Sequence, residues 1–182
     1  ALPAAIGSAR IGPSLRLLVL GTAGTGKTHT AQIAINEVRR RLGSFESVVT
    51  MAFSGVAAAN LGSGAKTIDS IFHTNAGDAA EDLVGDRVGA LVEEMEYAEM
   101  LVIDEVSTCG AAALDIINRR MQQVARVLWC IQFGISPPED MAPFGGVGML
   151  LMGNFAQLPP VLATSVLPGM PMTCLLYTSP SP

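Results

Sequence analysis

Short runs of consecutive hydrophobic residues, with no polar residue between them, occur at three places in the chain. They are Leu17–Leu20, Met100–Ile103 and Met149–Met152. Runs of this kind are typical of strands that are buried on both faces, as in a parallel sheet. A fourth run, Ser47–Phe53, is rich in β-branched residues, which favour strands. The pattern therefore predicts four strands of one mainly parallel sheet.

Between these runs, hydrophobic residues recur with the spacing of a helix. One stripe precedes Gly43, a residue type that favours a helix end, and a second follows residue 113. We also expect an exposed acidic helix between Asp78 and Glu99, a segment with eight acidic residues and one basic residue. Strands that alternate with helices predict a three-layer α/β domain. The two stripes are Ala31, Ala34, Ile35, Val38 and Leu42, and Leu114, Ile117, Met121, Val124 and Leu128.

The composition excludes several classes of protein. The chain has 182 residues, which suits one domain, and 49% hydrophobic residues exclude a chain that is disordered throughout. A net charge of −5 argues against a broadly basic nucleic-acid coat, although a local groove built from backbone N–H groups stays open. No unbroken apolar run approaches the roughly 20 residues of a membrane-spanning helix, so no membrane partner is expected.

Two groups of residues are interpreted as structural. Cys109, Cys130 and Cys174 are scattered and form no CxxC pair, which indicates reduced intracellular thiols and not a disulfide frame or a zinc site. The arginines of Arg39–Arg41 fall in the last turn of the first predicted helix. We interpret them as compensation of the helix dipole on a solvated face, with a DNA-binding patch as the alternative.

A glycine-rich loop is the strongest chemical signal. Leu17–Leu20 runs directly into a GxxxxGK[ST] sequence, and a helical pattern follows, which is the context that this phosphate-binding motif requires. In such a loop the glycines allow successive N–H groups to surround an anion. Lys27 would reach the β- and γ-phosphates, and the Thr28 hydroxyl would bind Mg²⁺. An ordinary glycine-rich turn is the structural alternative. The loop consists of Gly21, Thr22, Ala23, Gly24, Thr25, Gly26, Lys27 and Thr28.

An acidic pair follows the second hydrophobic run and would complete such a pocket. Asp104 and Glu105 come directly after Met100–Ile103. Asp104 is expected to hold Mg²⁺, and Glu105 to polarise the attacking water. An adjacent glutamate favours hydrolysis of a nucleoside triphosphate over transfer of its phosphoryl group to a small metabolite. An acidic pair after a strand is also common without any function.

Further segments identify a family resemblance. Ser54–Asn60 is followed by Thr67–His73, and Ile103–Ser107 leads into a helix that carries Asn118, Arg119 and Arg120. Phe144–Gly146 precedes the sequence MGNFAQLPPV, Met152–Val161. Together these segments resemble the PIF-type (petite integration frequency) DNA helicases, relatives of the RecD helicases in superfamily one. The last segment is close to a family signature.

The resemblance implies an ATP-dependent motor that moves 5′ to 3′ on single-stranded DNA and unwinds duplex. It implies a P-loop NTPase (RecA-like) fold, with ATP and Mg²⁺ held between this domain and a second RecA-like domain of the same chain. Gln157 would sense the γ-phosphate as a third catalytic residue beside Lys27 and Glu105. Ser54, Gly55 and Thr67 would contact DNA phosphates. For Thr67, capping of a helix is the alternative.

Several positions depart from the family pattern. Asn154 stands where Asp is usual, Asp69 replaces a His, and Thr108 replaces a Met. The adenine-reading glutamine that usually precedes the loop has no counterpart in Ala1–Arg16. Two alternatives therefore stay open: a diverged nucleotide-binding module that no longer translocates, and a P-loop ATPase of another type.

The ends of the chain suggest a fragment. We expect a short N-terminal stub at residues 1–14 and an incomplete first RecA-like domain at residues 15–173. Residues 174–182, CLLYTSPSP, resemble the translation of a sequencing-library adapter, with a natural Ser/Pro tail as the alternative. Such a fragment is expected to bind Mg–ATP weakly and to hydrolyse it poorly, because half of the nucleotide pocket is absent. The expected location is intracellular, with nucleus and mitochondrion both open.

Overall fold

The computed structural model describes residues 14–62, 64–74 and 81–154. Every strand pairing in these residues is parallel, and the sheet has the order β1-β5-β4-β2-β3. The predicted parallel sheet is confirmed, with one short strand, β3, that the hydrophobic runs did not indicate. The strands are β1 (Arg16–Leu20), β2 (Val48–Ala52), β3 (Lys66–Thr67), β4 (Met100–Asp104) and β5 (Gly148–Gly153).

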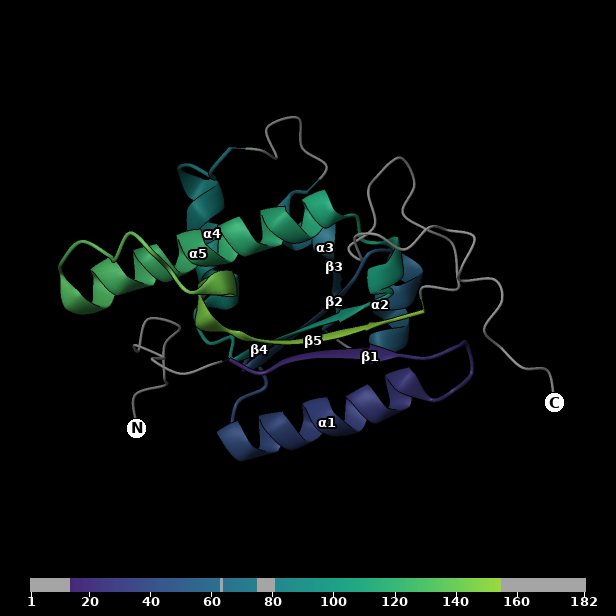
Figure 1. Cartoon of the computed structure of the whole chain (residues 1–182). Coiled ribbons are helices and arrows are strands. Elements are labelled where there is room, and N and C mark those ends of the chain that lie inside the picture. The colour runs from purple at the N-terminus through teal and green to yellow at the C-terminus, as the bar shows by residue number, and fades with distance from the viewer. Residues whose placement is uncertain (1–13, 63, 75–80, 155–182) are drawn as a thin grey trace.

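Helices cover both faces of the sheet and complete the predicted three-layer α/β fold (Figure 1). The helices α1 (Lys27–Leu42) and α2 (Gly55–Leu61) pack in one hydrophobic cluster, on one face. A second cluster lies on the other face and contains side chains of the remaining helices. These are α3 (Ile68–Phe72), α4 (Asp86–Met95) and α5 (Ala111–Phe133), with the 3₁₀ turns η1 (Val106–Thr108) and η2 (Pro143–Gly146).

The two predicted helical stripes contribute to the faces that pack on the sheet, although Ala34 and Leu42 of the first stripe are exposed. In α1, Ala31 and Ile35 are each 3% exposed. In α5, Ile117, Met121 and Val124 are fully buried. The central strand β4 is buried along its whole length. Burial of these aliphatic side chains, at about 25 cal/mol per Å² of apolar surface, stabilises the fold.

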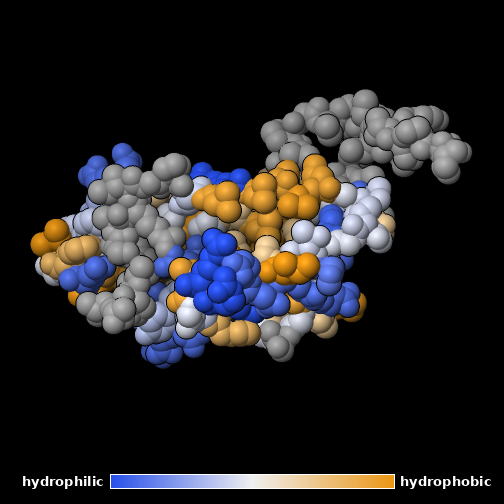
Figure 2. Space-filling model, turned by 90° about the horizontal axis from the view of Figure 1, so that it is seen from below, coloured by the Kyte–Doolittle hydropathy of each residue, from blue (hydrophilic) through white to orange (hydrophobic). Residues whose placement is uncertain are grey.

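The strand β1 differs from its prediction. It pairs only with β5 among the described residues and forms an edge of the sheet. Leu17, Leu18 and Leu20 are 48%, 40% and 54% exposed, so the prediction of burial on both faces is wrong for β1. Figure 2, which views the α1 side of the molecule, shows hydrophobic residues gathered beside hydrophilic ones on this surface. A hydrophobic run indicates that a strand can be buried on both faces. Whether the strand lies at the edge of the sheet depends on strand order, which the run does not specify.

The predicted acidic helix is shorter than its acidic segment. Helix α4 begins at Asp86, after Gly85 with a φ of 59°, and ends at Met95. Before it, the backbone of Leu83 is held by the side chain of Gln123 in α5, through bonds of 3.2 and 2.6 Å. Leu91 and Met95 are buried, so α4 contributes to the core as well as to the acidic surface. Residues 75–80 lie outside the described residues.

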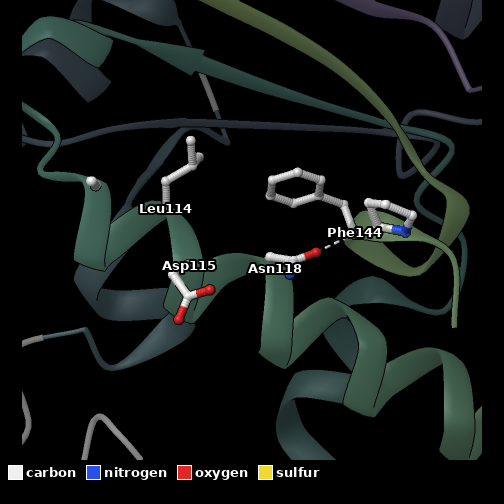
Figure 3. A pocket seen from close by; sticks show the side chains of 6 residues that line it. Leu114, Asp115, Asn118 and Phe144 are labelled. Atoms are coloured by element: carbon white, nitrogen blue, oxygen red, sulfur yellow. Dashed lines mark hydrogen bonds between the residues drawn. The ribbon is translucent and has the colours of Figure 1, made fainter. Parts of the chain in front are cut away.

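Two segments that carry the family resemblance meet at the turn η2. The amide of Phe144 donates to Oδ1 of Asn118 in α5 over 2.7 Å, as Figure 3 shows. Phe144 and Gly145 both have left-handed backbones, with φ of 54° and 63°. In the close-up, the Phe144 ring and Leu114 project into the same shallow pocket. The Asn118 bond therefore holds a turn that packs closely against α5 just before β5 begins.

Replacing Gly145 by alanine is expected to destabilise the fold by roughly 2–4 kcal/mol. A Cβ at this position would lie 2.6 Å from the carbonyl oxygen of Met121, and φ is positive. Gly134 is a matched control, because its φ is +66° and a Cβ added there would have no neighbour within 4 Å. Gly134→Ala should cost only about 1–2 kcal/mol. Urea denaturation measures both values, and equal costs for the two variants would contradict the close packing.

The arginine cluster and the cysteines take structural positions. Arg40 and Arg41 are exposed and pair with Glu37, and the hydrogen bond from Arg40, followed by that from Arg41, lowers the pKa of Glu37 to about 2. Arg39 lies 3.7 Å from the centre of the Phe45 ring. The solvated position is thus confirmed for Arg40 and Arg41, whereas Arg39 is partly buried and donates to the carbonyl oxygen of Val48 over 2.9 Å. Burial raises the pKa of the free Cys109 thiol to about 11.

In the part of the chain described, no helix has the length and apolar character to cross a membrane.

Candidate nucleotide site

The glycine-rich loop lies between β1 and α1, as the sequence predicts. Gly24 and Gly26 have φ of 77° and 82°, a backbone region that glycine adopts without strain. A Cβ on Gly21 would lie 2.9 Å from Oγ1 of Thr25. Thr25 Oγ1 in turn donates to the carbonyl oxygen of Thr22 over 2.9 Å. The loop is therefore shaped by its glycines and by the Thr25 hydrogen bond, and it ends at the N-terminus of α1, where anions are favoured.

The ammonium group of Lys27 lies over this loop. Its Nζ donates to the carbonyl oxygens of Gly21 and Thr22, over 2.6 and 2.8 Å. Lys27 is the first residue of α1, and its side chain runs back along the loop. A phosphate in the loop would meet the positive charge of Lys27 on one side and backbone N–H groups on the other.

Thr28 in α1 and Asp104 at the end of β4 lie in contact. The Thr28 hydroxyl donates to Oδ2 of Asp104 over 3.3 Å, although 76 residues separate them. Asp104 ends β4 and is 8% exposed. A hydroxyl and a carboxylate at this spacing fit Mg²⁺, which takes hard oxygen ligands and is usually held by one or two protein groups together with substrate phosphates. Outside residues 1–13, 63, 75–80 and 155–182, no cluster of three or more His, Cys, Asp or Glu forms a metal site by itself.

Glu105 has a left-handed backbone, with φ of 56° and ψ of 37°. This conformation costs a residue with a Cβ about 1–2 kcal/mol, so neighbouring bonds must hold it. The Glu105 amide donates to Oδ1 of Asp104 over 2.8 Å, and the Glu105 carbonyl accepts from the amide and the hydroxyl of Thr108 over 2.9 and 2.7 Å. Thr108 therefore has a role that sequence reasoning missed: its hydroxyl fixes the turn that carries Glu105.

One hollow joins these groups. It contains residues from the glycine-rich loop, from the ends of β4 and β5, and from α2. Asn154 lies in its wall, and Ala57 and Asn60 of α2 were not predicted as site residues, although they belong to the Ser54–Asn60 segment that carries the resemblance. Gln157 lies outside the described residues. The lining residues are Ala23, Gly24, Lys27, Thr28, Ala57, Asn60, Asp104, Glu105, Gly153 and Asn154.

The candidate DNA-contacting residues lie along the same edge of the sheet. Ser54 caps α2, and its Oγ accepts from the amide of Ala57 over 3.2 Å. Gly55 is the first residue of α2 and is exposed, like Ser54. Thr67 ends β3, where its Cα pairs with that of Ala52 at the end of β2. The strand pairing therefore brings Ser54 and Thr67 to the same end of neighbouring strands, and Ser54 contacts Ala57 and Glu105, two residues that line the hollow.

Thr67 also caps a helix, which was the alternative to DNA contact. Its Oγ1 accepts from the amide of Ser70 over 3.2 Å at the start of α3. Thr67→Ala is expected to destabilise the fold by about 1 kcal/mol, because α3 loses this capping bond. Thr67→Ser keeps a capping oxygen and should stay within about 0.5 kcal/mol of the wild type. Urea denaturation separates the two variants, and equal stabilities would contradict the capping role.

The fold and the site together define the class of protein. A parallel sheet, a glycine-rich loop between its edge strand and a helix, and the Lys27, Thr28 and Asp104 arrangement are those of a P-loop NTPase domain of the RecA-like type. The chain belongs to the PIF1-like helicase family, whose family model matches residues 2–176.

Comparisons with individual proteins agree with this family. The chain is 31% identical over 144 residues to the ATP-dependent DNA helicase RRM3 of Saccharomyces cerevisiae, across 78% of this chain and 18% of RRM3. Its fold is similar to the crystal structure of the Pif1 helicase from Candida albicans, with a TM-score of 0.62 and 25% identity. The match covers 81% of this chain and 31% of the Candida chain. The crystal structure of Bacteroides Pif1 in complex with ADP-AlF3 and single-stranded DNA is similar with a TM-score of 0.58 and 29% identity, and the match covers 82% of this chain and 30% of that one. The chain thus spans less than a third of these relatives.

Proposed function

We propose that this chain is the first of two RecA-like motor domains of an ATP-dependent DNA helicase. Residues 15–173 would form the domain, which hydrolyses ATP, moves 5′ to 3′ on single-stranded DNA and unwinds duplex together with a second RecA-like domain. The observation that carries this proposal is the meeting of Lys27, Thr28, Asp104 and Glu105 around one hollow. An intracellular location, in the nucleus or the mitochondrion, belongs to the same proposal.

Each of the predicted nucleotide-site residues has a proposed role. Gly21–Gly26 and the N-terminus of α1 bind the phosphates, and Lys27 neutralises charge on the β- and γ-phosphates. Thr28 and Asp104 hold Mg²⁺, which supplies electrostatic stabilisation of the transferred phosphoryl group. Glu105 orients and polarises the attacking water. Gln157 senses the γ-phosphate.

The proposed DNA contact depends on short side chains and open backbone. Ser54, Gly55 and Thr67 lie at the carboxyl ends of the neighbouring strands β2 and β3, and such groups contact phosphates without adding basic charge. This agrees with a net charge of −5. Among the similar solved structures, one of Bacteroides Pif1 holds single-stranded DNA together with ADP-AlF3. That complex supports single-stranded DNA as the partner proposed for this chain.

Two measurements test this function. Hydrolysis of Mg–ATP should rise when single-stranded DNA is added, and an absence of any DNA effect would count against a translocating motor. Sequencing of the transcript beyond Thr173 tests the domain assignment. A second RecA-like domain with arginines for the γ-phosphate supports it, and a stop codon shortly after Pro182 contradicts it.

A diverged nucleotide-binding module is a second candidate, because Asn154 lies in the wall of the hollow and removes a charge usual in the family. Asp69 adds a negative charge near the proposed DNA path, and its Oδ1 accepts from the Thr74 hydroxyl over 3.3 Å. If these two residues have abolished coupling, the double variant N154D/D69H in the complete polypeptide should gain unwinding activity. No gain would argue against this candidate.

A further inference from the structure

The Ser54 hydroxyl lies between the candidate DNA edge and the candidate catalytic carboxylate. Ser54 follows β2 and Glu105 follows β4, and these neighbouring strands pair in register, with Ala52 opposite Asp104. Both side chains therefore leave the sheet at the same edge. Oγ of Ser54 donates to Oε2 of Glu105 over 3.4 Å, across 51 residues of sequence.

The hydroxyl of Ser54 has a single proton to donate. Its oxygen already accepts from the Ala57 amide, which caps α2. A serine hydroxyl carries one O–H donor and two acceptor lone pairs, so its one proton can serve one strong acceptor at a time. In this structure that acceptor is the carboxylate of Glu105. If another anionic oxygen becomes the acceptor of this hydrogen bond, Glu105 loses it.

The backbone of Glu105 is held by several short hydrogen bonds, whereas its carboxylate accepts a long one from Ser54. Thr108 and Asp104 hold the left-handed backbone through the bonds described above. Ser54 is exposed and Glu105 is partly buried, so the side-chain contact is reachable from solvent. The 3.4 Å separation is long for an O–H···O bond, which makes this contact easy to exchange.

We propose that Ser54 is a positioning residue that couples the DNA edge to Glu105. Without DNA, its hydroxyl holds the carboxylate of Glu105 away from the attacking water. When a DNA phosphate oxygen accepts the hydrogen bond of the Ser54 hydroxyl, the carboxylate turns toward that water and hydrolysis accelerates. Only hydrogen bonds exchange in this step, and no covalent bond or charge is transferred. The proposal rests on the proposed function, which assigns ATP to the hollow and single-stranded DNA to the edge.

Three substitutions isolate the hydroxyl. Ser54→Ala removes the bond to Glu105 together with the capping bond of α2, and it should raise hydrolysis in the absence of DNA about tenfold, within the usual range of coupling between sites. Ser54→Thr keeps both the hydroxyl and a capping oxygen and should behave like the wild type. Ser47→Ala is a matched control, because Ser47 lies at the other end of β2 and its hydroxyl also donates one bond, to the carbonyl oxygen of Ser44 over 2.7 Å.

Single-turnover hydrolysis with the protein in excess over Mg–ATP, with and without a dT oligomer, measures these rates. A second readout does not depend on turnover: the ¹³Cδ signal of Glu105 in an NMR spectrum, assigned by its loss in Glu105→Gln. The oligomer should move this signal in the wild type and in Ser54→Thr, and leave it in place in Ser54→Ala.

Fluorescence anisotropy of a labelled dT oligomer measures DNA binding, and it distinguishes a failure of the proposed function from a failure of the Ser54 proposal alone. If the oligomer does not bind the chain, the DNA part of the proposed function fails and the switch fails with it. If the oligomer binds while the Glu105 signal stays in place, or while Ser54→Ala keeps the wild-type rates, the switch alone is overturned. A faster DNA-free rate in Ser54→Ala but not in Ser54→Thr or Ser47→Ala supports it.

Discussion

Glu105→Gln should lower the rate of ATP hydrolysis by about two to four orders of magnitude, the range that general-base catalysis contributes. The amide has the size of the carboxylate but cannot accept a proton from the attacking water. The turn that carries residue 105 should survive, because it is held by the backbone of Glu105 and by Thr108. Binding of Mg–ATP should be at least as tight as in the wild type, since the variant removes a negative charge from the wall of the hollow.

Two measurements on the same variant distinguish a catalytic effect from a loss of binding. Single-turnover hydrolysis gives the rate, and a fluorescent ATP analogue gives the dissociation constant. Glu46→Gln is the matched control, because Glu46 is an exposed glutamate that precedes β2 at the opposite edge of the sheet. Hydrolysis by Glu105→Gln at the wild-type rate would remove Glu105 from the mechanism and leave the hollow as a binding site.

The fold could be predicted wherever a local pattern also decides the tertiary position. Met100–Ile103 is hydrophobic and central, and the structure buries it as β4. Leu17–Leu20 is equally hydrophobic, yet β1 is an edge strand, because strand order depends on contacts between distant segments. The acidic segment near α4 was predicted as one long helix, and Gly85, with its positive φ, delays the helix start to Asp86.

The candidate site could be predicted where its functional residues are consecutive in the sequence. The glycine-rich loop and the Asp104–Glu105 pair were both identified, and the structure places them around one hollow. The contacts of Thr108 and Ser54 with Glu105 were not predicted. Thr108 acts through the backbone of a left-handed residue, and Ser54 reaches Glu105 only because β2 and β4 pair in register. Neither relation leaves a spacing signal in the sequence.

Lys27→Ala should weaken binding of Mg–ATP by about ten- to a hundredfold, because a hydrogen bond to a charged group contributes roughly 1.5–3 kcal/mol. Nζ of Lys27 lies over the glycine-rich loop and supplies a positive charge to the hollow. Hydrolysis should be lost as well, since the same ammonium group stabilises negative charge on the transferred phosphoryl group. Titration with a fluorescent ATP analogue, followed by a hydrolysis assay at saturating ATP, measures the two effects separately.

The fold should tolerate this substitution, because the two bonds of Lys27 go to loop carbonyls and its side chain is not part of the core. Lys66 is the matched control: its ammonium group forms an exposed ion pair with Glu94 over 2.7 Å, away from the hollow. Lys66→Ala should leave ATP affinity unchanged and cost at most about 1 kcal/mol of stability. If Lys27→Ala and Lys66→Ala bind Mg–ATP equally well, the glycine-rich loop does not bind phosphate through Lys27, and the assignment of the hollow to ATP fails.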